Sequence, residues 1–164
     1  MRHLILLLLT LCGTGAHASG QTELLGLDGS SHALGAYIGR GQWVMVNVWS
    51  PGCPHCVAEV PTLRQFHNNN EFGAMVLGVT VAYPGFGYPE EEQVRKFANE
   101  NKINFPLLLA DRKLASDFVG SYVDVVPITL AFNPTGQMVA KWHGVITLLD
   151  INEIIRDFSV QTNE

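Results

Sequence analysis

The sequence predicts one α/β domain: a central mixed sheet flanked by helices, with a β-hairpin added on its N-terminal side. Two near-continuous apolar runs, residues 43–49 and 74–81, match strands that are buried on both faces of a parallel sheet. A helix is expected to follow each of these runs, at about 53–68 and 90–101. Two further apolar runs lie on either side of residues 133–136 (Asn-Pro-Thr-Gly), a strong turn signal that joins antiparallel strands.

The predicted elements form a strand-helix-strand-helix series that ends in a hairpin and a helix. Near the start, Asp28-Gly29 marks a turn between two short strands. Residues 36–39 are expected to form one helical turn that ends at a glycine. The expected strands are 43–49, 74–81, 106–109, 128–132 and 138–142. The expected helices are 53–68, 90–101, 113–119 and 148–158. In the first helix, Pro54 suits the first position and Pro61 should cause a kink.

Composition narrows the range of functions. Of 164 residues, 47% are hydrophobic and 15% are charged, so the chain can bury a core and does not have the composition of a disordered protein. The formal net charge is −5 and the basic residues do not cluster. No nucleic-acid partner is therefore expected.

The first eighteen residues have the pattern of a secretory signal peptide. Arg2 precedes the apolar run 4–11, and Ala16-His17-Ala18 matches a small-x-small cleavage site. We therefore expect a signal peptide at 1–18, a mature domain at 19–164 and a periplasmic location. Membrane anchoring is not expected, because the apolar run is shorter than the roughly 20 residues of a span. Lipidation at Cys12 and an uncleaved anchor remain as alternatives.

The cysteines point to redox chemistry. Of three cysteines, Cys12 leaves with the signal peptide, so the mature chain keeps Cys53 and Cys56. A disulfide between residues this close closes a short loop and gains little chain entropy. We therefore expect a reactive pair of cysteines. A structural disulfide is the alternative.

The motif Cys53-Pro54-His55-Cys56 follows a buried strand and opens a helix, the context of a redox Cys-x-x-Cys pair. Free N–H groups and the helix dipole favour the thiolate of Cys53, the expected nucleophile. Cys56, one turn further on and expected to be more buried, would resolve the mixed disulfide. A protonated His55 would make the disulfide more oxidising; the alternative is an exposed spacer.

A zinc site is the main rival for this pair, but structural zinc takes four ligands. The sequence has no second cysteine pair, and His32, His67 and His143 lack ligand spacing. Neither a metal nor another cofactor is expected.

Six segments carry a further signal: residues 27–29, 41–49, 53–56, 59–61, 125–129 and 133–136. Together they resemble the TlpA/ResA branch of exported thioredoxin-like proteins. The resemblance covers nearly the whole mature chain and implies a thioredoxin fold. It also implies that Pro127 is a cis proline facing the cysteines and that the Val126 backbone binds an extended client segment. Glu59 matches an acid beneath the cysteines that exchanges protons with Cys56 and has a raised pKa; a solvent-facing glutamate is the alternative.

Two departures from the branch stand out. Gly52 occupies the usual place of a tryptophan, which predicts a more exposed Cys53. The Pro54-His55 dipeptide resembles the oxidising DsbA proteins, although the chain has no room for their helical insertion. A loop with Tyr83, Phe86 and Tyr88 should lie at the carboxyl edge of the sheet. It either forms an apolar rim for a partner or packs on its own domain.

The favoured function is a monomeric periplasmic disulfide reductase of the cytochrome c maturation type. Its partners would be protein clients with disulfides or thiols and a membrane electron donor of DsbD type. One alternative is a DsbA-like dithiol oxidant or isomerase. Another is a binding module that holds copper(I) with Cys53, Cys56 and His55, since soft thiolates select copper(I). A peroxiredoxin-type peroxidase is the least supported alternative function, because residues 45–53 lack the Pro-x-x-x-Thr/Ser-x-x-Cys motif.

Overall fold

The computed structural model describes residues 22–69 and 73–160, so the predicted signal peptide lies outside the described residues. The strands are β1 (Glu23–Gly26), β2 (Ser31–Ala33), β3 (Val44–Trp49), β4 (Met75–Thr80), β5 (Leu107–Leu109), β6 (Ile128–Phe132) and β7 (Met138–His143). The helices are α1 (Pro54–Asn69), α2 (Glu91–Glu100), α3 (Arg112–Val119) and α4 (Leu148–Val160).

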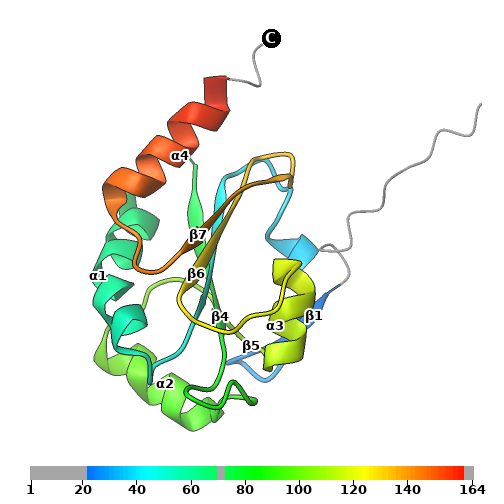
Figure 1. The fold of residues 1–164 in the computed structure, drawn as a ribbon, viewed down its shortest axis with the longest axis vertical. Helices are drawn as coiled ribbons and strands as arrows, with labels where there is room; N and C mark the ends of the chain where they lie inside the picture. The colour runs from blue at the N-terminus through cyan, green and yellow to red at the C-terminus, as the bar shows by residue number, and fades with distance from the viewer. Residues whose placement is uncertain (1–21, 70–72, 161–164) are drawn as a thin grey trace, which may run out of the picture.

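The strands form one mixed sheet in the order β2-β1-β5-β4-β3-β6-β7. Strands β3, β4 and β5 run parallel, and the remaining pairs are antiparallel. Figure 1 shows α1, α2 and α4 on one side of this sheet and α3 on the other. The predicted α/β class with a central mixed sheet is therefore confirmed.

Strand β3 lies inside the sheet, between β4 and β6, and all six of its residues are buried. Its neighbours β4 and β6 are almost as fully covered, because helices lie over both faces of the sheet. This position explains why residues 43–49 are nearly continuous in apolar side chains. Since α1 begins a few residues after β3 ends, its first turn lies at the carboxyl edge of the sheet.

The predicted N-terminal hairpin is present and extends the sheet beyond β5. Strand β1 pairs with both β2 and β5, and the turn between β1 and β2 contains Asp28 and Gly29. Gly29 has a φ of +79°, the left-handed region that glycine enters without steric cost.

Most predicted element boundaries agree with the structure to within two residues. Helix α1 begins at Pro54 rather than Cys53, and it continues through Pro61. The predicted helical turn at 36–39 is a 3₁₀ turn at Leu34–Ala36, two residues earlier. Among the described residues, no helix combines the length and the apolar character that a membrane span requires.

Candidate active site

Cys53 and Cys56 lie at the start of α1, where β3 has ended. The Cys53 carbonyl accepts the N–H of Val57 at 3.0 Å, the first bond of the helix, so Cys53 occupies the N-cap position. Its Sγ accepts the backbone N–H of Cys56 at 3.3 Å. The sulfur therefore takes the place of a capping oxygen, and this contact favours negative charge on it. Both cysteines are free thiols in this structure.

Both cysteines are buried, which corrects the expectation of an exposed Cys53. Cys53 is 2% exposed and Cys56 is 1% exposed, so the predicted difference in burial between them is very small. Tyr83 explains why Cys53 is buried although it was predicted to be exposed, because Tyr83 lies against Gly52. A Cβ placed on Gly52 would lie 3.2 Å from the Tyr83 carbonyl oxygen and 3.8 Å from its ring. A residue distant in sequence therefore covers the place that the missing tryptophan leaves open.

The loop before β6 lies on the other side of Cys53. The Cys53 thiol donates a weak hydrogen bond to the Val126 carbonyl, with 3.5 Å between sulfur and oxygen. The peptide bond between Val126 and Pro127 is cis, as the resemblance implied. Both residues are buried, and within the described chain the Val126 N–H has no hydrogen-bond acceptor. The backbone of Val126 thus brings an unpaired donor close to the reactive sulfur.

Glu59 lies one helical turn beyond Cys56, and its side chain is fully buried. Its Oε1 accepts the Asn47 amide at 2.8 Å, and its Oε2 accepts the backbone N–H of Ile146 at 3.0 Å. The Asn47 amide also donates to Thr129 Oγ1 at 3.0 Å. Two other elements therefore donate to this carboxylate, β3 and the segment before α4, and Thr129 of β6 accepts the second hydrogen bond of the Asn47 amide. The alternative of a solvent-facing glutamate is wrong.

Burial sets the protonation of both Glu59 and Cys56. Desolvation raises the pKa of Glu59 from 4.5 to about 7, and the hydrogen bonds from Ile146 and Asn47 offset only part of that effect. Burial is also the first reason that the pKa of Cys56 lies far above its ordinary value. The hydrogen bond and charge of Cys53 raise it further, and the charge of Glu59 adds a smaller contribution. Near pH 7, Cys56 therefore keeps its proton, while Glu59 is divided between its two forms.

Pro54 and His55 fill the two positions between the cysteines, and both are exposed. Pro54 is the first residue of α1, where the missing N–H leaves no helical bond unmade. Among the described residues, no hydrogen bond or ion pair is made to the His55 side chain. They also contain no cluster of three or more side chains able to hold a metal ion.

Asn47 and Thr129 are the two members of this site that the sequence reasoning did not single out. Both are buried polar residues in strands that otherwise read as apolar. Burying an amide in a core is costly unless it is hydrogen-bonded. The lone asparagine in the run Trp43–Trp49 was therefore a usable signal that a polar partner lies opposite β3.

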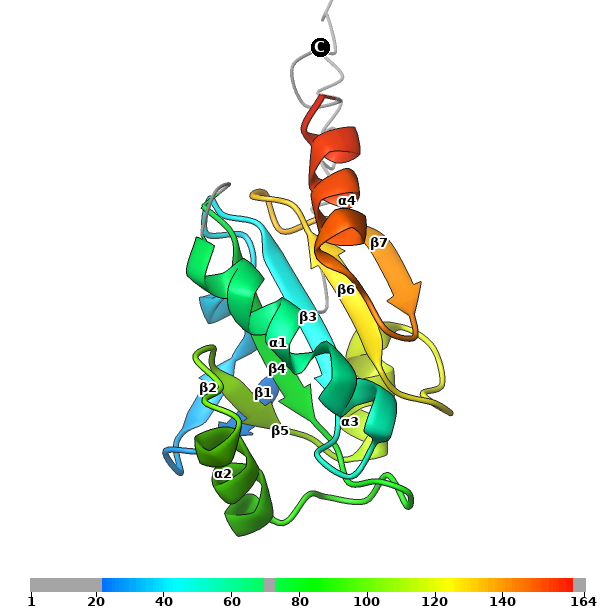
Figure 2. The same cartoon turned by 90° about the vertical axis from the view of Figure 1, so that its left-hand side faces the viewer.

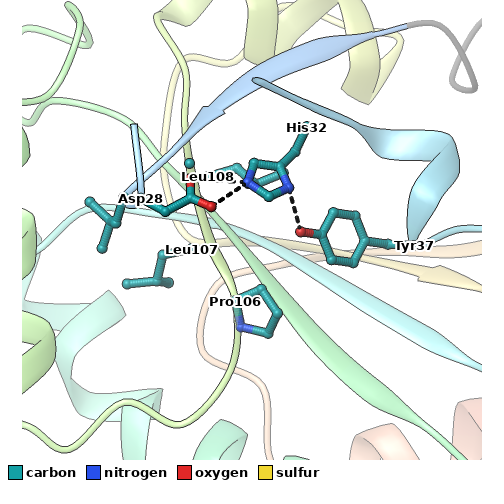
Figure 3. Close-up of a pocket in the computed structure, with 8 residues that line it drawn as sticks. Asp28, His32, Tyr37, Pro106, Leu107 and Leu108 are labelled. Atoms are coloured by element: carbon teal, nitrogen blue, oxygen red, sulfur yellow. Dashed lines mark hydrogen bonds and ion pairs between the residues drawn. The ribbon is translucent and has the colours of Figure 1, made fainter. Parts of the chain in front are cut away.

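A second polar cluster lies on the N-terminal hairpin, separated from β3 by β5 and β4. His32 Nε2 lies 3.1 Å from Asp28 Oδ1, and its Nδ1 lies 3.1 Å from the Tyr37 hydroxyl. Figure 3 shows the three side chains in line beside Pro106–Leu108. They border a cavity of about 200 Å³ whose lining includes neither cysteine.

The sheet and the helix-capping dithiol together define a thioredoxin-like protein. The chain belongs to the AhpC/TSA family, whose model matches residues 16–143.

Its relatives support the predicted branch. It is 25% identical over 130 residues to the thiol-disulfide oxidoreductase ResA of Halalkalibacterium halodurans, covering 79% of this chain and 68% of that protein. It is 24% identical over 115 residues to the sporulation thiol-disulfide oxidoreductase A of Bacillus subtilis, covering 70% of this chain and 67% of that protein. These relatives confirm the predicted enzyme class, a thiol-disulfide oxidoreductase.

The fold is also that of a secreted thiol-disulfide isomerase from Corynebacterium glutamicum. That structure matches with a TM-score of 0.70 at 20% identity, over 82% of this chain and 80% of the other. At this identity the match supports the predicted thioredoxin fold alone.

Proposed function

We propose that this chain is an exported, monomeric reductase of disulfides in periplasmic proteins, of the cytochrome c maturation type. The arrangement of Cys56 and Glu59 carries the proposal: a buried thiol that holds its proton, next to a buried carboxylate with a pKa of about 7. A resolving thiol needs such a base to attack, because only its thiolate is nucleophilic. The signal-like N-terminus supports export.

The first step uses Cys53. Its thiolate, stabilised by the Cys56 N–H, attacks one sulfur of the client disulfide. A bond forms between Cys53 Sγ and that sulfur, the client S–S bond breaks, and the other client sulfur leaves as a thiolate that takes a proton. The unpaired Val126 N–H would donate to a backbone carbonyl of the client segment, as in strand addition.

The second step uses Cys56 and Glu59. The Glu59 carboxylate accepts the Cys56 proton, and the resulting thiolate attacks Cys53 Sγ. The Cys53–Cys56 disulfide forms and the second client sulfur leaves as a thiolate, so the client has gained two electrons. A membrane donor of DsbD type would then return two electrons, and two protons would complete the dithiol.

A dithiol oxidant or isomerase is the second candidate, and the exposed His55 favours it. When protonated, an imidazole next to Cys53 would stabilise the thiolate and so the reduced protein, which makes the disulfide a stronger oxidant. The reductase is preferred because its support comes from the scaffold and Glu59, whereas the oxidant rests on Pro54 and His55.

The reduction potential separates the two candidates. The purified chain is equilibrated in thiol-disulfide buffers, and its thiols are counted at each ratio. A potential near that of thioredoxin, about −270 mV, supports the reductase, and one near about −120 mV supports the oxidant. Stoichiometric copper(I) binding with no turnover of disulfides would contradict both. With Cys56→Ser, the reductase should accumulate mixed disulfides with its clients through Cys53.

A further inference from the structure

The loop after β4 lies against Gly52, the residue before Cys53. Tyr83 of this loop makes that contact and is 44% exposed, so it both packs beside the motif and faces solvent. Phe86, three residues on, is buried and packs edge-on against the Tyr83 ring with 6.2 Å between centroids. The sequence left open whether this loop forms a rim or packs on its own domain, and the structure divides the two roles between Tyr83 and Phe86.

The segment before β6 covers the other side of Cys53. It ends at Val126, whose carbonyl contacts the Cys53 thiol, and it exposes Val125 (53%) and Tyr122 (68%). Figure 2 shows that the start of α1, the loop after β4 and this segment all lie at the same end of the sheet. Exposed apolar side chains therefore flank the reactive sulfur from two separate loops.

Arg112, the first residue of α3, joins these two loops. Its guanidinium lies over the Phe86 ring at 4.5 Å and the Tyr122 ring at 5.5 Å. It donates to the Tyr122 hydroxyl at 2.5 Å and to the Gly85 carbonyl at 3.3 Å. Its backbone N–H donates to the Phe86 carbonyl at 3.1 Å. The Arg112 side chain thus contacts both the loop after β4 and the segment before β6.

The backbone of Phe86 shows how firmly this contact holds the loop. Its φ is +50°, a left-handed conformation that is costly for a bulky residue and persists only where the surroundings enforce it. The buried ring, the Arg112 cation and the two hydrogen bonds from Arg112 supply that enforcement. A lysine has one compact charge and cannot stack on two rings while donating to two loops.

We propose that Tyr83 and Val125 select client segments with an apolar side chain next to the reacting cysteine. Arg112 is then the positioning residue that holds the two loops carrying Tyr83 and Val125. The inference rests on the proposed function and adds the substrate class. The exposed tyrosine ring and valine offer apolar area directly beside the attacking sulfur. Asp124 is exposed between Tyr122 and Val125, so an acidic client residue would meet a like charge. The guanidinium of Arg112 contacts the two rings and donates to two oxygens of the protein itself.

The test uses disulfide-linked peptides that differ only in the residue before the cysteine, either phenylalanine or glutamate. Hydroxyethyl disulfide serves as a small substrate without a peptide. The wild-type chain should show a kcat/KM for the phenylalanine peptide at least about tenfold above that for the glutamate peptide. Tyr83→Ser and Arg112→Ala should lower this preference to about twofold or less, and Arg112→Lys should not restore it. Tyr83→Phe should keep it.

The matched control is Arg156→Ala, which removes an exposed arginine on α4 and should keep the wild-type preference. If Arg112→Ala does not fold, Tyr83→Ser and Tyr83→Phe decide the matter alone. A wild-type chain that reduces hydroxyethyl disulfide without peptide preference overturns this inference alone, as does an unchanged preference in Tyr83→Ser. A chain that reduces neither kind of substrate overturns the proposed function instead.

Discussion

Glu59 and Asp28 are both carboxylates that accept several hydrogen bonds, yet their pKa values move in opposite directions. Asp28 lies on the hairpin with its side chain 61% exposed. The pKa of Asp28 lies far below the ordinary value, mainly because of the hydrogen bonds from Ser30. The hydrogen bond from His32 lowers it further. Glu59 accepts bonds from Asn47 and Ile146, but it is fully buried, and its pKa rises to about 7.

The comparison shows that desolvation outweighs hydrogen bonding when a carboxylate is completely covered. In water, each accepted bond favours the charged form at little cost. In the core, the same bonds offset only part of the lost hydration. The hairpin carboxylate is therefore always charged near neutral pH, whereas Glu59 can exchange a proton there. This difference separates a structural cluster from a catalytic candidate.

The largest predicted difference between the two regions is in activity. Cys53→Ser should lower disulfide reduction to the background rate of the buffer, because Cys56, the other cysteine of the described residues, is buried and keeps its proton near pH 7. His32→Ala, in the hairpin cluster, should stay within about twofold of wild type. Both variants would be assayed with the same peptide disulfide. A loss of activity in His32→Ala would show that the two regions are coupled.

A second prediction concerns proton transfer. Glu59→Gln keeps the shape of the side chain but removes the base, so the rate of disulfide exchange should fall about 100-fold. The pH–rate profile should also lose the limb that titrates near pH 7 in the wild-type protein. Asp28→Asn is the matched control and should keep both the rate and that limb. A wild-type profile in Glu59→Gln would exclude Glu59 as the base.

The third prediction concerns stability. The folded pKa of Glu59 is above its unfolded value, so the folded state holds the proton more tightly. Stability should therefore fall as pH rises from about 4.5 to about 7, by about 3 kcal/mol at about 1.4 kcal/mol per unit. Urea unfolding of the reduced protein at several pH values would measure this. Glu59→Gln should remove most of the slope, and an unchanged slope would mean that another group causes it.

The smallest effect is expected for Asp28→Asn, and its sign is opposite. The folded pKa of Asp28 is depressed, so its contribution to stability is present above pH 3.8 and is lost as pH falls below it. The variant should be slightly less stable than wild type at pH 7 and equal to it in strong acid. The same urea series would record this. A variant that gains stability at pH 7 would contradict the assigned hydrogen bonds.

The local features of the site were predictable from the sequence. A buried strand, a break at 50–52 and a proline at the first helical position place Cys53 and Cys56 one turn apart at a helix start. These features depend on neighbours within a few residues, so their pattern is visible along the chain. The hairpin at Asp28-Gly29 is predictable for the same reason.

Contacts between distant segments were decided only by the tertiary structure. The sequence predicted an exposed Cys53 beside Gly52, but Cys53 is buried, and Tyr83, thirty-one residues after Gly52, lies against that glycine. The resemblance indicated an acid at Glu59, but the hydrogen bonds that Asn47 and Ile146 donate to it come from two distant elements. Thr129 of a third element accepts from Asn47. Desolvation depends on everything that packs around a group, and no spacing along the chain encodes that sum. By itself, the sequence therefore determined which residues could react, and the packed fold decided how they are covered and protonated.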